Sequence, residues 1–153
     1  MKLGSTLYLR LSLIAMAAFI AFICALMSPA FMNKEYESYR LLVVALYVAA
    51  LPFFYSLYQA WKLLGFIDKK QAFSQASLKA LGTVRNCALT ISGLFVLYLP
   101  IFWDQADRMD APGIFAIGLL ITFMASVIAG FTALLQKLFE QAFTLKSEND
   151  LTV

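Results

Sequence analysis

Three carboxylates follow one another at three-residue spacing in a short polar segment: Asp104, Asp107 and Asp110. Carboxylate oxygens are the ligands that a hard cation such as calcium prefers. The spacing does not match an EF-hand loop, however, and Arg108 places a positive charge among the acids. A simpler interpretation makes Asp110 the N-cap of the following helix, with Pro112 in its first turn. We therefore expect no metal site here.

The two cysteines, Cys24 and Cys87, are the candidates for thiol chemistry. A membrane thiol oxidoreductase needs cysteines that can exchange a disulfide near the membrane surface. At about 1.5 Å per residue, Cys24 lies about 20 Å into its apolar stretch and Cys87 only about 5 Å into another. Because a disulfide needs Cα atoms within about 7 Å of each other, we expect both cysteines to be small packing residues.

Other catalytic groups are scarce. The chain has no histidine, which removes the commonest general base and the commonest transition-metal ligand. No acidic residue falls inside an apolar stretch, so the usual marker of a proton-coupled carrier, including the small four-helix multidrug exporters, is missing. We assign no catalytic residue and no cofactor, and we expect a protein that is not an enzyme.

The elements that hold these residues are four long apolar stretches. Of the 153 residues, 62% are hydrophobic and 14% are charged. A run of about 20 apolar residues spans the roughly 30 Å hydrocarbon core as a helix, and these runs lack the alternation of barrel strands. The sequence predicts an all-α integral membrane protein, a four-helix transmembrane bundle in one domain (1–153). The expected spans are 11–32, 41–64, 84–103 and 113–135.

The charges divide unequally between the two sides of this bundle. The side with both termini and the 65–83 loop has four acidic residues, while the opposite side has five acidic and three basic ones. Excess lysine and arginine stay in the cytoplasm, so we expect both termini and the loop to be cytoplasmic. The same asymmetry explains the net charge of +3 without direct binding of nucleic acid. The basic residues of that side are Lys2, Arg10, Lys62, Lys69, Lys70, Lys79, Arg85, Lys137 and Lys146.

Rows of small residues predict how the helices pack. Lipid tails are as apolar as leucine, so close backbone approach at small residues supplies much of the association energy. We expect a close-contact face on every helix. A self-association motif would look the same, which leaves monomer and homo-oligomer open. The rows are Ala17, Ala21 and Ala25; Ala45 and Ala49; Ala88 and Ser92; Ala125, Ala129 and Ala133; and Ser126 and Gly130.

Pro52 and Pro100 lie inside the second and third stretches, where proline favours a kink. One interpretation is a kinked cavity with an aromatic wall, which would suit a transporter or channel for a small apolar or amphipathic molecule. The simpler interpretation, which we favour, is ordinary curvature with Trp61 and Trp103 anchored at the two membrane interfaces. The flanking aromatic residues are Phe53, Phe54, Tyr55, Tyr58, Trp61, Tyr98, Phe102 and Trp103.

The third and fourth helices should be longer than the membrane. Ser74 is a good N-cap, which would start the third helix well before residue 84. After residue 135 an amphipathic stripe continues, which predicts a cytoplasmic helical tail over 136–153. The stripe could lie on lipid headgroups, on the loop near Phe73 or on a partner, and packing within the chain is the simplest of these. Its apolar residues are Leu135, Leu138, Phe139, Ala142 and Phe143.

Four segments carry a resemblance to a known family: Leu63–Ser74, Asp110–Gly113, Leu134–Lys137 and Lys146–Val153. They resemble the YoaS-like family of small four-pass bacterial membrane proteins, a domain of unknown function. The resemblance implies a multi-pass protein of the bacterial cytoplasmic membrane whose gene commonly neighbours a small helix-turn-helix regulator. It suggests a membrane component that binds or restrains such a regulator. The matching residues are Asp68, Lys69, Ala72, Phe73, Ser74, Glu148, Asn149, Asp150, Leu151 and Val153.

We therefore expect a non-enzymatic membrane protein that presents its cytoplasmic loop and tail to a protein partner, with the lipid bilayer around its helices. The alternative is the small transporter or channel with the proline-kinked cavity. The residues expected to bind the partner are Asp68, Lys69, Phe73, Glu148, Asp150 and Leu151.

Overall fold

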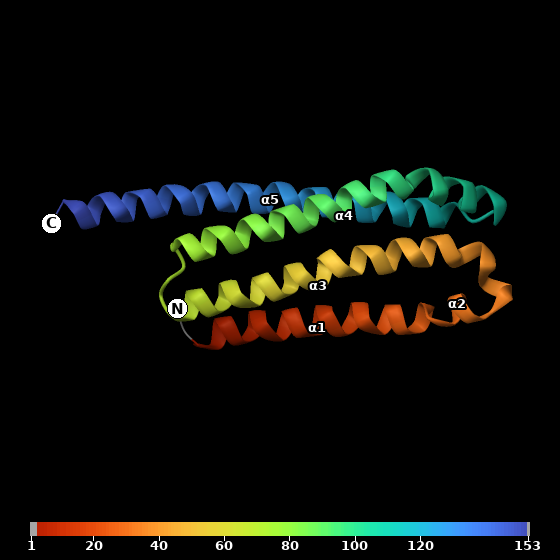
Figure 1. Cartoon of the computed structure of the whole chain (residues 1–153), viewed down its shortest axis with the longest axis horizontal. Helices are drawn as coiled ribbons and strands as arrows, with labels where there is room; N and C mark the ends of the chain where they lie inside the picture. Colours follow the sequence, from red (N-terminus) through yellow and green to blue (C-terminus); the bar gives the residue numbers. More distant parts are fainter. Residues whose placement is uncertain (1–2, 153) are drawn as a thin grey trace.

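The computed structural model describes residues 3–152, which form four long helices of alternating direction (Figure 1). Lys2 and Val153 lie outside these residues. Within them there is no strand, and all four long helices are long and apolar enough to cross a membrane, so the expected all-α membrane fold is confirmed. The long helices are α1 (Leu3–Met27), α3 (Arg40–Asp68), α4 (Gln75–Arg108) and α5 (Pro112–Leu151). Two short elements, α2 (Pro29–Met32) and the 3₁₀ helix η1 (Lys34–Tyr39), join α1 to α3.

The four helices are arranged as a row rather than as a closed square. Helix α1 lies along α3, α3 along α4, and α4 along α5, with the most extensive contact between α4 and α5 and the least between α1 and α3 (Figure 1). Within residues 3–152, α1 has no extended packing against α4 or α5. We call the end with the α3–α4 connection the loop end, and the end with α2 and η1 the η1 end.

The α4–α5 interface is built on small residues. Ala125 and Ala129 of α5 are buried, and the ring of Phe102 lies directly over Gly118. The hydroxyls of Ser92 and Ser126 are 2.7 Å apart and share a hydrogen bond across the interface. In lipid, such close backbone approach and interhelical hydrogen bonds supply the attraction between helices.

The expected small-residue faces are confirmed on α3 and α4, where Ala45, Ala49 and Ala88 are buried. The expectation is wrong for α1, since Ala21 and Ala25 are exposed. Only Ala17 of this row is partly buried, and α1 has α3 as its one extensive neighbour.

The first helix is not continuous over 11–32 as expected. It ends at Met27, and a new turn begins at Pro29, because proline has no N–H to continue the ladder. The N–H of Ser28 bonds the carbonyl of Ala25 rather than that of Cys24. The hydroxyl of Tyr47 donates instead to the Cys24 carbonyl. A backbone acceptor at membrane depth needs such a partner, so this bond also ties α1 to α3.

The two expected helix starts have opposite outcomes. Ser74 is confirmed as the N-cap of α4, where its Oγ accepts a hydrogen bond of 3.2 Å from the N–H of Ser77. Asp110 is not the N-cap of α5. Ala111 holds that position, and Asp110 adopts a left-handed conformation with φ of 50°. Pro112 occupies the first turn as expected.

Helix α5 continues far past residue 135, and its stripe packs within the chain. The rings of Phe73 and Phe139 meet edge to face with centroids 5.1 Å apart. Phe143 is half-buried, whereas every residue from Thr144 to Thr152 is exposed. The amphipathic stripe therefore rests on the α3–α4 connection for its first two turns and is then free of it.

An ion pair fastens α1 to α3 near the loop end. Arg10 Nη2 lies 2.7 Å from Asp68 Oδ2, and both side chains are about two-thirds buried. The guanidinium also stands 5.0 Å from the ring centroid of Trp61. Together with the Tyr47 bond at the other end of α1, this contact supplements the least extensive of the three helix interfaces.

We predict that Gly118→Ala destabilises the bundle relative to Gly130→Ala. A Cβ at position 118 would lie 2.9 Å from the Phe102 ring, while one at position 130 meets nothing within 4 Å. Both variants gain the same helix propensity, so their difference should be the overpacking cost of about 1–3 kcal/mol. Unfolding by SDS in mixed micelles measures it. Equal stability of the two variants would contradict a close contact between Gly118 and Phe102.

We also predict that Asp68→Asn loosens α1 from α3. Loss of the charge on Asp68 leaves the part-buried Arg10 guanidinium without its carboxylate and should cost about 1 kcal/mol of stability. Asp107→Asn is the matched control, because Asp107 is exposed and no ion pair holds it. The same micelle unfolding assay compares them, with proteolysis near residue 28 as a local readout. No difference between the two variants would show that the ion pair does not hold α1.

Candidate functional site

The structure divides the predicted partner-binding residues of the loop by role. Asp68 is engaged with Arg10, so it serves the fold of the chain itself. Lys69 follows the last residue of α3 and is exposed. Phe73 is 44% exposed although one face of its ring meets Phe139. Lys69 and one face of Phe73 therefore remain accessible at the loop end.

The predicted residues of the tail, Glu148, Asp150 and Leu151, lie in the last turns of α5 and are all exposed. Leu151 is 84% exposed. From Phe139, which touches the loop, to Leu151 the helix advances about 18 Å at 1.5 Å per residue. Figure 1 shows this part of α5 projecting past the other helices. The loop residues and the tail residues therefore form two separate groups at the same end of the molecule.

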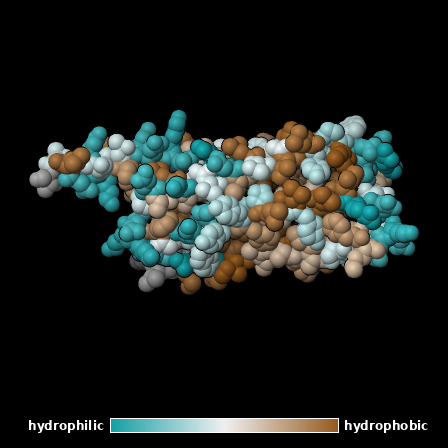
Figure 2. Space-filling model, in the orientation of Figure 1, coloured by the Kyte–Doolittle hydropathy of each residue, from teal (hydrophilic) through white to brown (hydrophobic). Residues whose placement is uncertain are grey.

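Polar and apolar side chains are segregated along the long axis. Hydrophilic residues gather at the two ends and along the projecting part of α5, and hydrophobic residues fill the middle (Figure 2). This distribution is that of a protein whose central band lies in a bilayer.

The other groups singled out for chemistry are placed apart. Asp104 pairs with Arg108 at 2.8 Å on the exposed face of the last turn of α4. Within residues 3–152 no three side chains of His, Cys, Asp or Glu come together to hold a metal ion. Cys24 and Cys87 are both free thiols, on α1 and α4.

An apolar groove runs along the row of helices. Its first segment, at the η1 end, has a volume of about 540 Å³. Its second segment, toward the loop end, has a volume of about 460 Å³. Leu46, Phe95 and Ile121 line both segments, so the two segments adjoin each other. The groove exists because α1 and α5 stand on either side of α3 and α4 without packing against each other.

The floor and the rim of the groove differ in burial. Val43 and Phe95 of the floor are each 2% exposed. Met16 of α1 and Met124 of α5 stand at the rim and are exposed. The rim is therefore part of the apolar outer surface, and the floor is shielded by it.

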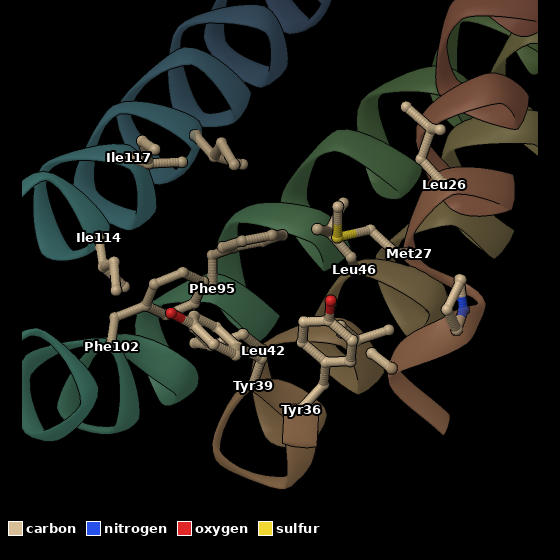
Figure 3. Close-up of a pocket in the computed structure, with 14 residues that line it drawn as sticks. Leu26, Met27, Tyr36, Tyr39, Leu42, Leu46, Phe95, Phe102, Ile114 and Ile117 are labelled. Carbon is tan, nitrogen blue, oxygen red and sulfur yellow. The ribbon is translucent and has the colours of Figure 1, made fainter. Parts of the chain in front are cut away.

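Two tyrosines of η1 line the first segment. Tyr36 and Tyr39 both belong to the lining of this segment, although η1 is kinked at Tyr36, where the backbone is not helical. Figure 3 shows both rings reaching from η1 toward the residues of the pocket, among them Leu46 and Phe102. The phenol hydroxyls are the polar groups that this otherwise apolar lining offers. The arrangement can bind an amphipathic molecule, but the lining contains no acid or base that ionises near neutral pH.

The groove differs from the alternative interpretation, a cavity lined at the two proline kinks. Neither Pro52 nor Pro100 borders either segment, and Pro100 is exposed. Of the flanking aromatic residues, Phe53 and Phe102 contribute to the groove, whereas Trp103 is exposed on the outer surface.

Sequence reasoning missed Tyr36 and Tyr39 as site residues. The available signal was their three-residue spacing inside a charged connection, between Lys34 and Arg40. That signal could not show which way the connection folds, because the break at Pro29 decides it.

Comparison with known proteins agrees with the fold and adds no activity. Residues 25–153 match the family described as "Protein of unknown function (DUF2975)". The chain is also 45% identical over 156 aligned residues to the "Uncharacterized membrane protein YoaS" of Bacillus subtilis (strain 168). That alignment covers 97% of this chain and 98% of the relative. No solved structure matches the chain. The expected family is confirmed: the chain belongs to the DUF2975 family and is similar to the membrane protein YoaS over almost its whole length.

Proposed function

We propose that this protein is a non-enzymatic, multi-pass protein of the bacterial cytoplasmic membrane that presents its loop end to a cytoplasmic protein partner, such as a small helix-turn-helix regulator. The observation that carries the proposal is the α5 extension, which we define as residues 136–151. It is helical to Leu151, yet the side chains of its last turns are exposed and project past the other helices (Figure 1). A helix built so far beyond its own bundle is available to another protein.

One face of the α5 extension supports a helix-in-groove mode of binding. Phe139 turns toward the loop, whereas Leu138 and Leu145 are exposed. Because they are seven residues apart, two turns, the two leucines lie on the same face of the helix. Apolar side chains at this spacing are typical of helices that bind in a hydrophobic groove of a partner protein.

The charges of the extension add a polar rim to that face. Lys146, Glu148 and Asp150 are exposed around the terminal turns. Lys69 and the accessible face of Phe73 lie at the same end, beside the start of the extension. An apolar anchor flanked by charges of both signs is the usual anatomy of a specific, non-obligate interface.

We predict that photo-crosslinking in cells from position 145 or 150 captures a protein, and that crosslinking from position 55 does not. Tyr55 is an exposed residue of the apolar middle and serves as the control. Deleting 147–153 with the crosslinker at position 145, or introducing Leu145→Asp with the crosslinker at position 150, should lower capture about tenfold, equivalent to about 1.4 kcal/mol of binding. Membrane insertion, followed by fractionation, should not change. Undiminished capture by both variants would contradict the proposal that α5 forms the interface.

The cytoplasmic orientation of the loop end is tested separately. In a Cys24→Ala, Cys87→Ala background, we predict that a cysteine at position 35 reacts with a membrane-impermeant maleimide in intact cells. Cysteines at positions 69 and 147 should react only after lysis, since the basic residues of the loop end retain it inside. Labelling of positions 69 and 147 in intact cells would show that the loop end lies outside. That result would contradict the proposal of a cytoplasmic partner.

A further inference from the structure

We propose that the groove between α1 and α5 binds one acyl chain of a bilayer phospholipid, whose polar end is held by Tyr36 and Tyr39 at the η1 end. This inference concerns a different part of the molecule from the α5 extension and does not depend on the proposed partner. It adds a ligand class and a binding site to the chain.

The first reason is that the groove continues the lipid-facing surface. Met124 and Ile117 of α5 and Leu26 of α1 line the groove and are at the same time exposed on the outer surface. A hydrocarbon chain that already lies on this surface can enter sideways, without crossing a polar barrier. Lipid is therefore the molecule that reaches the groove first.

The second reason is the chemistry of the floor. Val43, Ala49 and Phe95 are buried and apolar, and an apolar cavity offers water no partners. An unfilled floor would also lose dispersion contacts along its whole length. Each CH₂ group that fills it recovers about 0.8 kcal/mol relative to water, although much less relative to bulk lipid. Binding should thus depend on shape and on the polar end rather than on hydrophobicity alone.

The third reason is the length of the groove. Its lining residues on α3 extend from Leu42 to Ala60, which corresponds to about 27 Å of helix at 1.5 Å per residue. Half of a roughly 30 Å hydrocarbon core is about 15 Å. The groove is therefore long enough for the complete chain of a lipid from the leaflet at the η1 end, lying parallel to the helices.

The fourth reason is the position of the two phenols. Tyr36 and Tyr39 stand where the end of the groove meets the polar η1 connection, and Figure 3 shows their rings among the apolar side chains of the pocket. A phenol hydroxyl at this level can donate a hydrogen bond to a phosphate or ester oxygen while its ring stays in an apolar environment. The two tyrosines thus select a lipid by its polar end.

The test uses the full-length protein in phosphatidylethanolamine and phosphatidylglycerol vesicles doped with a phospholipid whose acyl chain carries a diazirine. After irradiation, peptide mass spectrometry locates the labelled residues. We expect label on the buried floor residues Val43 and Phe95, which bulk lipid cannot reach unless a chain enters the groove, and on the partly buried Leu46 between them. Label confined to outward residues such as Leu97 and Phe131, or a crosslinked second copy in place of lipid, would overturn the proposal.

A matched pair of variants tests occupancy of the groove. Met124→Trp fills it from the rim, whereas Phe123→Trp places the same indole side chain one residue away on the outer surface, outside the lining. We expect floor labelling to fall at least fivefold in Met124→Trp and to be unchanged in Phe123→Trp. Because both positions are exposed, both variants should insert and fold. Equal floor labelling in the two variants would contradict entry of the chain through this rim.

A second pair tests the polar end. Tyr36→Phe together with Tyr39→Phe removes the two hydroxyls and keeps the rings, and Tyr55→Phe together with Tyr58→Phe is the control on the outer face of α3. Competition of the labelled phospholipid by unlabelled phospholipid should weaken several-fold in the first double variant only. Unchanged competition would show that the two hydroxyls do not hold the lipid. Displacement by a free fatty acid at equal concentration would show that the phospholipid headgroup is not recognised.

Discussion

The close approach of α4 and α5 is the interaction on which the rest of the structure depends. Inside a bilayer, water does not drive apolar helices together, so attraction must come from contact and hydrogen bonding. Gly118 lets the Phe102 ring lie against the α5 backbone, and Ser92 and Ser126 share a hydrogen bond nearby. Farther along the interface, Arg85 donates a 2.9 Å hydrogen bond to the Gln136 side chain. This one long interface keeps α5 straight and directs its extension beyond the loop end.

The limited packing of α1 also follows from the need for direct contacts between helices in a bilayer. Ala21 and Ala25 of this helix are exposed, and its links to α3 include the Arg10–Asp68 ion pair and the Tyr47 hydrogen bond. A helix held on one side only cannot close the bundle. The open row that results exposes the apolar groove along α3 and α4 and leaves lipid as its natural neighbour.

The two candidate sites therefore lie at different depths and call for different partners. The α5 extension is a solvent-level helix with leucine anchors and charges, suited to a protein. The groove lies at membrane depth and ends at two phenol hydroxyls, suited to an amphiphile. Both are proposed as binding surfaces, and the charged groups near them are engaged in holding helices, as Asp68 is, or are exposed at the ends.

Much of the fold could be read from the residues themselves, because helix formation in lipid is nearly obligatory for a long apolar run. The four helices, the cap at Ser74, the buried alanines of α3 and α4 and the contact of the α5 stripe with Phe73 all follow from local pattern. The exposed positions of Lys69 and of the tail residues follow from it as well.

Other features were decided by the tertiary structure. The alanine row of α1 has the same spacing as those of α3 and α5, and only the absence of a second neighbour for α1 leaves it unused. Asp68 and Lys69 are adjacent in the chain, but only Asp68 comes within reach of an arginine 58 residues away. The groove, with Tyr36 and Tyr39 at its end, arises from the order in which helices lie side by side. Apolar periodicity specifies the helices, but in a solvent as apolar as leucine it cannot specify which helix each face will meet.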